Sequence, residues 1–254
     1  MKKLVVNSDD FGVCHAVNEG ILRGFREGIL TQASLMVPCP WAEEAMSMAR
    51  EHGLPIGIHL TVTGEWDNLR WRPLTHAPSL VYDDNTLPRS VEEVQKRADR
   101  AELEAEYAAQ IELVRARGIE PCHVDMHMRP VDREVTARVI RRYGIRCRSD
   151  MGPDYADCAF PFTSRTSLTN DARAQKMDKT EWLRRHVEGL SEGVHFVCCH
   201  LSERSPEVRA MSSTGGPWAE DYRVTDTDAV CAPGLRELCD ENGVELISCA
   251  DFPD

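Results

Sequence analysis

The stretch LVVNSDDFGVCHAVNEGIL, residues 4–22, predicts the first strand and the first helix of the chain. Its apolar start indicates a short buried strand over residues 3–7. Apolar residues that recur every four positions indicate a helix from about residue 14 to 28. The adjacent carboxylates of Asp9 and Asp10 lie at the junction between them. A strand that leads directly into a helix is the repeating unit of parallel α/β folds.

The same alternation continues along the rest of the chain. Further strands are predicted at 32–37, 55–62, 121–128, 144–149, 194–200 and 244–249, and helices at 41–52, 90–117, 132–143, 178–190 and 226–242. Stretches without a clear period lie at 63–89, 150–177 and 201–225. About seven strand–helix repeats predict an α/β fold of parallel strands covered by helices. Because no linker divides the chain, we expect one domain over residues 1–254, either a closed or distorted barrel or an open doubly wound sheet.

Composition excludes several classes of partner. The net charge of −12 argues against nucleic acid or an anionic membrane as the main partner. The ten cysteines form no C-x-x-C motif, so we expect reduced, mostly structural thiols. The start of the chain has too few apolar residues for a signal peptide, and no segment is long enough to span a bilayer; a cytoplasmic location is therefore expected. The absence of a G-x-G-x-x-G or Walker motif argues against a nucleotide cofactor.

Ionisable side chains follow four of the predicted strands. Asp9 and Asp10 end the first strand, His59 lies late in the third, the stretch HVDMH occupies residues 123–127, and His200 ends a later strand. Because reactive groups in parallel α/β folds lie at the carboxyl ends of strands, we expect these side chains to share one cleft. Each also has an ordinary explanation, since an Asp before a helix is a good N-cap and a buried His is often a hydrogen-bonded core residue.

The stretch HVDMH places three polar side chains on one face of a strand. His123, Asp125 and His127 alternate with apolar residues, so they point the same way. Two neighbours can converge on one small ion, and His127, nearest the strand end, is the better ligand. Asp125 is then either a ligand or a group that fixes an imidazole. A polar edge strand is the alternative.

The two adjacent carboxylates require a positive partner. Like charges this close are costly unless a helix N-terminus, a basic side chain or a metal ion lies between them. Asp9 and Asp10 together exceed what capping a helix needs. Since histidines are predicted at the same edge, the sequence favours a metal ion.

These residues resemble the motifs of the YdjC-type carbohydrate deacetylases, the chitooligosaccharide deacetylase-like family. The resemblance is carried by residues 4–22, by GIHLTVTGEW at 57–66 and by HVDMH at 123–127, with support from WRPLTHAPSL at 71–80 and LRELCDENGVELISCADF at 235–252. It implies a distorted (β/α) barrel related to polysaccharide deacetylases, with about seven parallel strands. It also implies one divalent metal ion, Zn²⁺ or Mg²⁺, held by one Asp and two His.

Position by position, the resemblance implies a role for each residue of the constellation. Asp10, His59 and His127 would be the metal ligands. Asp9 would be the general base, and His200 matches a late catalytic histidine. The implied reaction is metal-dependent hydrolysis that removes an N-acetyl group from an amino sugar or short oligosaccharide.

The chain departs from the family pattern at two places. Residues 127–131 read His-Met-Arg-Pro-Val where the family commonly has H-Q-H-V-H, and Leu201 follows His200 where the family usually has Pro. Arg129 near the cleft would favour an anionic substrate. We therefore expect His123, Asp125 and Arg129 to support the metal site or face the substrate.

Two other functions stay open. A metal-dependent phosphoesterase or other hydrolase on the same barrel would use similar Asp and His groups, and release of acetate or of phosphate separates the two. A catalytically silent sugar-binding protein would bind without turnover. Trp66, Trp71 and Trp218 in the predicted loops could stack on sugar rings or serve as packing. The sequence does not identify the sugar, and it leaves open whether the chain forms a homo-oligomer.

Overall fold

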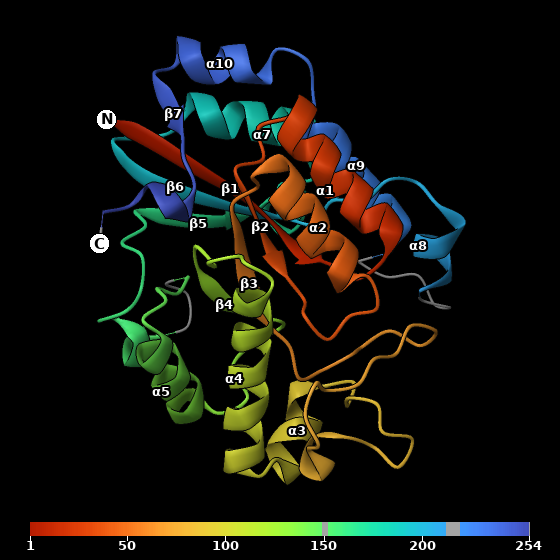
Figure 1. Cartoon of the computed structure of the whole chain (residues 1–254). Coiled ribbons are helices and arrows are strands. Elements are labelled where there is room, and N and C mark those ends of the chain that lie inside the picture. The colour runs from red at the N-terminus through yellow and green to blue at the C-terminus, as the bar shows by residue number, and fades with distance from the viewer. Residues whose placement is uncertain (149–151, 212–218, 254) are drawn as a thin grey trace.

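The computed structural model describes residues 1–148, 152–211 and 219–253 and contains one parallel sheet (Figure 1). The strands are β1 (Lys2–Phe11), β2 (Gln32–Leu35), β3 (Ile56–Leu60), β4 (Val124–Met126), β5 (Ser164–Ser167), β6 (Gly193–Cys199) and β7 (Val244–Leu246). Their order is β4-β3-β2-β1-β6-β5, and every ladder is parallel. The predicted class of parallel strands with intervening helices is confirmed.

The helices lie around this sheet (Figure 1). They are α1 (His15–Glu27), α2 (Ala42–His52), α3 (Val91–Arg97), α4 (Arg100–Ala116), α5 (Arg133–Tyr143), α6 (Leu168–Ala174), α7 (Lys179–Glu188), α8 (Pro206–Ala210), α9 (Glu220–Val230) and α10 (Leu235–Glu241), with 3-10 turns η1 (Pro78–Leu80), η3 (Pro153–Tyr155) and η4 (Cys249–Asp251). In the described parts of the chain, no helix has the length and apolar character needed to cross a membrane.

The strand order is that of a distorted barrel. Strands β1 to β4 are neighbours in sequence order, and β5 leads to β6, which returns to β1. Between β4 and β5, the described residues contain only two isolated parallel bridges, Val124–Cys147 and Cys147–Ala159. The sheet is therefore curled rather than closed by a continuous ladder. This resolves the choice that the sequence left between a barrel and an open doubly wound sheet.

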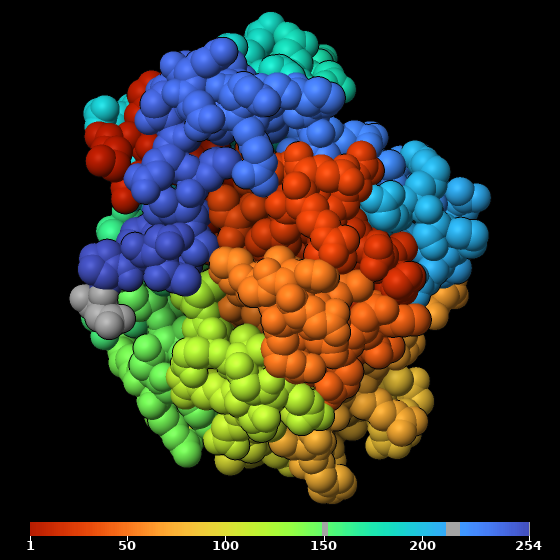
Figure 2. Space-filling view, turned by 45° about the horizontal axis from the view of Figure 1, so that its top comes forward, coloured from red at the N-terminus to blue at the C-terminus, as the bar shows by residue number. Residues whose placement is uncertain are grey.

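The central strand β1 is buried and pairs with strands from both the amino-terminal and the carboxyl-terminal part of the chain. Strand β6 pairs with it from Lys2 to Ser8 on one side. On the other side, β7 pairs with its first residues and β2 with its carboxyl-terminal half. Helix α1 also packs against α9, and Figure 2 shows the red amino-terminal part of the surface beside the blue carboxyl-terminal part. The carboxyl end of β1 is thus fixed at the centre of the fold.

Several predicted elements are wrong in detail. The helix expected over 90–117 is two helices, because Asp99 breaks the run and caps α4 by accepting hydrogen bonds from the backbone N–H groups of Ala101 and Glu102. The helix expected over 226–242 is also divided, since Pro233 cannot continue α9.

The predicted strand at 144–149 is reduced, within its described part, to the bridges of Cys147. Conversely, the stretches read as irregular contain regular elements. Residues 150–177 include β5 and α6, and 201–225 include α8 and the start of α9. Strand β5 is short and only partly buried, so it carries little apolar pattern.

Candidate active site and metal centre

The end of β1 turns two neighbouring carboxylates to the same side. The register between β1 and β2 shifts between Ser8 and Phe11, and Asp10 has a φ of 70°. In a regular strand, adjacent side chains point to opposite faces, but a bulge re-aims them. As a result, Asp9 Oδ2 lies 3.9 Å and Asp10 Oδ1 3.8 Å from one atom, His59 Nε2. An unusual backbone conformation of this kind is typical of functional sites.

The three residues predicted as metal ligands converge. Asp10 Oδ1 lies 3.8 Å from His59 Nε2 and 3.7 Å from His127 Nδ1. All three atoms lie within 4.8 Å of one another, and all three residues are buried. These separations are too long for hydrogen bonds. They suit an ion that contacts each atom at about 2.0–2.2 Å.

Each of the two imidazoles is oriented by a second carboxylate. His59 Nδ1 hydrogen-bonds with Asp125 Oδ1, and His127 Nε2 lies 2.8 Å from Glu65 Oε2. A carboxylate partner keeps the proton on the nitrogen that faces it, so the other ring nitrogen has a free lone pair. Both free nitrogens face Asp10. This donor set therefore fits a divalent metal ion.

A buried polar network lies behind His59. Asp125 Oδ2 accepts a hydrogen bond of 2.8 Å from Ser34 Oγ, and it lies 3.3 Å from Arg148 Nη1. His123 Nε2 lies 2.9 Å from the same Ser34 hydroxyl and 3.5 Å from Asp125 Oδ2. Asp125 therefore contacts the proposed ligand His59, whereas His123 contacts Ser34 and Asp125.

Gly57 leaves the space that the ring of His123 occupies. A Cβ at position 57 would lie 2.3 Å from this ring, so we expect Gly57→Ala to destabilise the fold by about 1–3 kcal/mol, as overpacking does. Thermal or urea unfolding measures this loss. The double variant with His123→Ala provides the control, since removing the ring should recover part of the loss. Strict additivity of the two single effects would contradict the packing explanation.

Each aspartate at the end of β1 also pairs with a buried arginine. Arg148 Nη1 donates to Asp9 Oδ1 at 3.0 Å, and Arg223 Nη2 donates to Asp10 Oδ2 at 2.6 Å. Burial alone would raise the pKa of Asp10, but Arg223 and the nearby imidazoles hold it below its usual range. The sequence argument favoured a metal as the positive partner of this pair. The structure shows that two basic side chains, those of Arg148 and Arg223, are also positive partners of these carboxylates.

The surroundings of His59 stabilise the protonated, positively charged form of its imidazole. Burial alone would lower the pKa of His59, but the carboxylates of Asp125 and Asp9 outweigh burial and raise that pKa to about 9. In the absence of another cation, the imidazole therefore holds a proton at neutral pH. A site that stabilises an extra positive charge is also suited to a metal ion.

His200 lies beside Asp9 and lines the same cavity as the predicted ligands. Its Nε2 is 4.0 Å from Asp9 Oδ2, and its backbone N–H donates to Asp226 Oδ2 at 2.9 Å. Burial lowers the pKa of His200 and outweighs the nearby carboxylates, so its imidazole is neutral at pH 7. A cavity of about 390 Å³ joins these groups; it is lined by Asp9, Asp10, His59, Glu65, Met126, His127, Met128, Arg148 and His200.

Three other predicted candidates lie outside this arrangement. Arg129 is about half exposed, and its guanidinium pairs with Glu92 instead of lining the cavity. Trp66 and Trp71 are buried; the ring of Trp66 stacks on His127 with centroids 6.0 Å apart. Both tryptophans therefore act as packing rather than as exposed surfaces for a sugar. Trp218 lies outside the described residues.

The sequence interpretation missed three charged residues of the site. Glu65 falls within a quoted motif, GIHLTVTGEW, but its role was not recognised. Arg148 lies at the end of the predicted strand 144–149, so the strand-end rule could have identified it. Arg223 lies in a stretch read as a loop, and nothing in the sequence pattern distinguishes it.

Comparison with known proteins identifies the family of this chain. Residues 3–241 match the family described as YdjC-like protein. Carbohydrate deacetylase 1 of Listeria innocua is 32% identical, over 98% of this chain and 100% of its own. A crystal structure from Enterococcus faecalis V583, described as a candidate cellobiose-phosphate cleavage protein, has a TM-score of 0.80 at 25% identity and covers 98% of this chain and 97% of its own.

A more distant structure shares the fold. The polysaccharide deacetylase of Bacillus cereus has a TM-score of 0.52 at 14% identity, over 100% of this chain and 96% of its own. The curled parallel sheet is thus that of the polysaccharide deacetylases, as the resemblance implied. On the match across nearly its whole length, the chain belongs to the YdjC-like protein family.

Proposed function

We propose that this chain is a metal-dependent carbohydrate deacetylase that removes an N-acetyl group from an amino sugar or a short oligosaccharide. The observation that carries the proposal is the convergence of Asp10, His59 and His127 beside Asp9, with His200 across the cavity. The name of the Listeria innocua relative supports the substrate class. One domain over residues 1–254 accords with a sheet that joins strands from both ends of the chain.

Asp10, His59 and His127 would hold the metal ion. Two imidazole nitrogens and one carboxylate oxygen suit Zn²⁺, and Mg²⁺ is the second candidate. When bound, such an ion polarises the acyl carbonyl and makes its water more acidic. Asp125 and Glu65 keep the two imidazoles in the orientation and tautomer that this binding needs.

Asp9 would take the proton of the attacking water. Arg148 and the amide of Asn7 both donate to Oδ1, which fixes the orientation of the carboxylate. Its Oδ2 faces both His59 and His200. An oriented, ionised carboxylate beside the water is what general base catalysis requires.

His200 would protonate the departing amine. Because its imidazole rests in the neutral form, it has to gain a proton during the reaction. Asp9 acquires a proton in the first step, and its Oδ2 lies 4.0 Å from His200 Nε2. The proton that leaves the water at Asp9 can therefore reach the amine by way of His200.

The variant His200→Ala should slow turnover by roughly 10²-fold, because proton transfer to the leaving group is lost. Its metal content at one equivalent of the ion should equal that of the wild type, since His200 is not one of the ligands Asp10, His59 and His127. Turnover and elemental analysis on the same preparation test both parts. An unchanged rate would remove His200 from the mechanism.

Metal binding should release a proton from His59. With a pKa of about 9 in the metal-free protein, His59 must lose its proton before its nitrogen can bind an ion. Apparent metal affinity should therefore rise by about tenfold per pH unit between pH 7 and 9 and level off above that. Calorimetry in buffers of different ionisation enthalpy counts the protons released. Asp125→Asn should reduce the number, and binding without proton release in the wild type would contradict the prediction.

The phosphoesterase alternative finds less support in the cavity. Among the described residues that line the cavity, Arg148 is the one arginine, and it is paired with Asp9 and Asp125. Arg129, which the sequence offered for an anionic substrate, pairs with Glu92 at the surface.

The deciding experiment treats metal-loaded protein with a panel of N-acetylated sugars and phosphorylated sugars. Acetate release from the first group supports the proposal. Phosphate release alone, or sugar binding without any turnover, would overturn it.

A further inference from the structure

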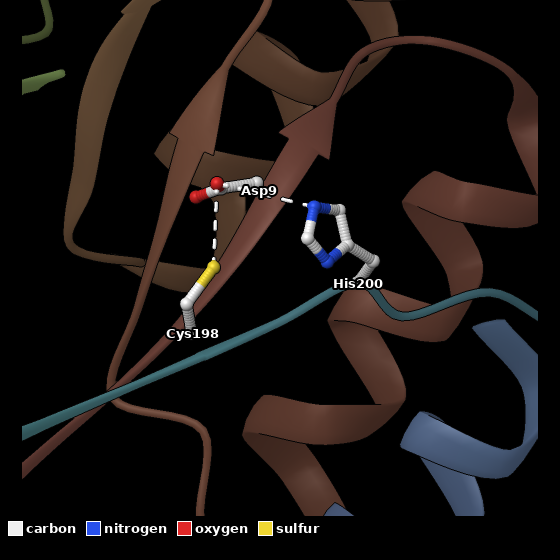
Figure 3. A group of neighbouring side chains, drawn as sticks. All are labelled: Asp9, Cys198 and His200. Carbon is white, nitrogen blue, oxygen red and sulfur yellow. Dashed lines mark hydrogen bonds and ion pairs between the residues drawn. The ribbon is translucent and has the colours of Figure 1, made fainter. Parts of the chain in front are cut away.

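Three side chains with different ligand atoms, those of Asp9, Cys198 and His200, meet beside the proposed metal ligands, and none of the three belongs to that first set. The thiol of Cys198 lies 3.3 Å from Asp9 Oδ2, and His200 Nε2 lies 4.0 Å from the same oxygen. One sulfur, one nitrogen and one oxygen thus lie within 4.8 Å of one another. Figure 3 shows the thiol and the imidazole both directed at the carboxylate.

The strand geometry explains why Cys198 and not its neighbour takes part. In β6, Cys198 is aligned with Asn7 and Cys199 with Ser8. Successive side chains of a strand point to opposite faces. The Cys199 thiol accordingly turns away and donates to the backbone carbonyl of Asn7 at 3.2 Å. A substitution of Cys198 therefore tests this group of side chains, and the same substitution at Cys199 serves as its control.

This group can be reached from solvent by a second cavity. Its volume is about 480 Å³, and Cys198, His200 and Phe196 contribute to its walls. Arg148 and His200 line both this cavity and that of the proposed active site. An ion can therefore approach the sulfur without passing the first set of ligands.

We propose that Asp9, Cys198 and His200 form a second metal site, separate from the first, that takes a thiophilic divalent cation such as Cd²⁺ or Zn²⁺. A thiolate, an imidazole and a carboxylate are ligands of Zn²⁺ and related ions, whereas Mg²⁺ prefers oxygen alone. On binding, the S–H bond of Cys198 breaks, its proton leaves to solvent, and the sulfur bonds to the ion.

Arg148 makes this site the weaker of the two. Its Nη1 lies 3.0 Å from Asp9 Oδ1 and 3.8 Å from the Cys198 sulfur. A fixed positive charge this close repels an incoming cation, and it lies beside two ligands of this site, whereas Arg223 donates to only one ligand of the first set, Asp10. The first site should therefore fill first, and the second only at higher concentrations of the ion.

Occupation of the second site has a consequence that rests on the proposed function. The ion would engage the Asp9 carboxylate and His200 Nε2, the two groups that the proposed reaction uses to move protons. An excess of Zn²⁺ or Cd²⁺ would therefore inhibit an enzyme that a single ion activates. Binding itself does not depend on turnover.

Titration of the full chain with Cd²⁺ tests the site directly. The ultraviolet charge-transfer band of a cadmium–thiolate bond reports the sulfur, and equilibrium dialysis counts the ions. The wild type should bind two ions and show the band with the second. Cys198→Ser keeps a donor to Asp9 and should bind one ion without the band, whereas Cys199→Ser should behave as the wild type. A band and second ion retained in Cys198→Ser would overturn the proposal.

The variant His127→Ala separates this site from the first. Because His127 belongs only to the first set of ligands, the variant should keep the thiolate band although it loses one ion. This result would support the second site even if no sugar were deacetylated. Loss of the band in His127→Ala, or its absence in the wild type, would contradict a separate site.

Discussion

Replacement of Asp9 by Asn is expected to lower kcat by roughly 10²–10⁴-fold, the usual contribution of a general base. The amide has nearly the shape of the carboxylate and can still accept a hydrogen bond from Arg148, but it cannot take a proton from water. Since Asp9 is not one of the three proposed ligands of the first site, the metal content at one equivalent of the ion should not change. Turnover and elemental analysis on the same sample measure both quantities.

The unfolding temperature of this variant serves as the control, because Arg148 loses one of its two charged partners and keeps Asp125. A variant that is folded, loaded with metal and inactive would support the assignment. Turnover close to that of the wild type in the same preparation would exclude Asp9 as the base.

Replacement of His127 by Ala is expected to remove both the metal and the activity. His127 Nδ1 is one of three donor atoms, and the other imidazoles that line the cavity, among the described residues, are His59, itself a proposed ligand, and His200. Glu65→Gln should have a graded effect, since loss of a supporting carboxylate typically costs about 10–100-fold in metal affinity. The order of affinities should be wild type, Glu65→Gln and then His127→Ala.

His186→Ala is the matched control for this series. His186 is partly buried, but it stacks on Trp182 and contributes to none of the metal-competent groups found among the described residues. It should keep full metal affinity. Full metal occupancy in His127→Ala would overturn the ligand assignment.

Local patterns in the sequence predicted much of the fold. The apolar run before Asp9 and the helical spacing after it correctly indicated β1 and α1, and strand–helix alternation indicated the parallel sheet. The predicted elements were wrong where contacts between distant residues, rather than the local sequence, determine the secondary structure. Cys147 pairs through two isolated bridges instead of a full strand, and β5 is partly exposed, so neither has a clear period.

The part of the site that lies at the ends of strands could be predicted from the sequence, because the strands themselves could be predicted. Asp10, His59 and His127 each follow an apolar strand, and parallel strands bring such ends together. The bulge that turns Asp10 beside Asp9 depends on the register between β1 and β2, which no local pattern specifies. Arg223 reaches Asp10 from α9, more than two hundred residues away, so only the folded chain reveals that contact.

The two arginines change the electrostatic account of the site. Arg148 and Arg223 balance the charges of Asp9 and Asp10 before any ion binds. Both carboxylates are therefore buried in the folded protein with a basic partner each. The ion then adds to a site already ordered by charge pairs and by the supporting carboxylates of His59 and His127.

The central claim is that one divalent ion is held by side chains from β1, β3 and the end of β4. Anomalous diffraction at the zinc edge, from crystals grown with stoichiometric Zn²⁺ and no chelator, tests it most directly. The account predicts a single strong peak bounded by Asp10 Oδ1, His59 Nε2 and His127 Nδ1. A catalytically active crystal form with its ion elsewhere, or with no ion, would contradict it.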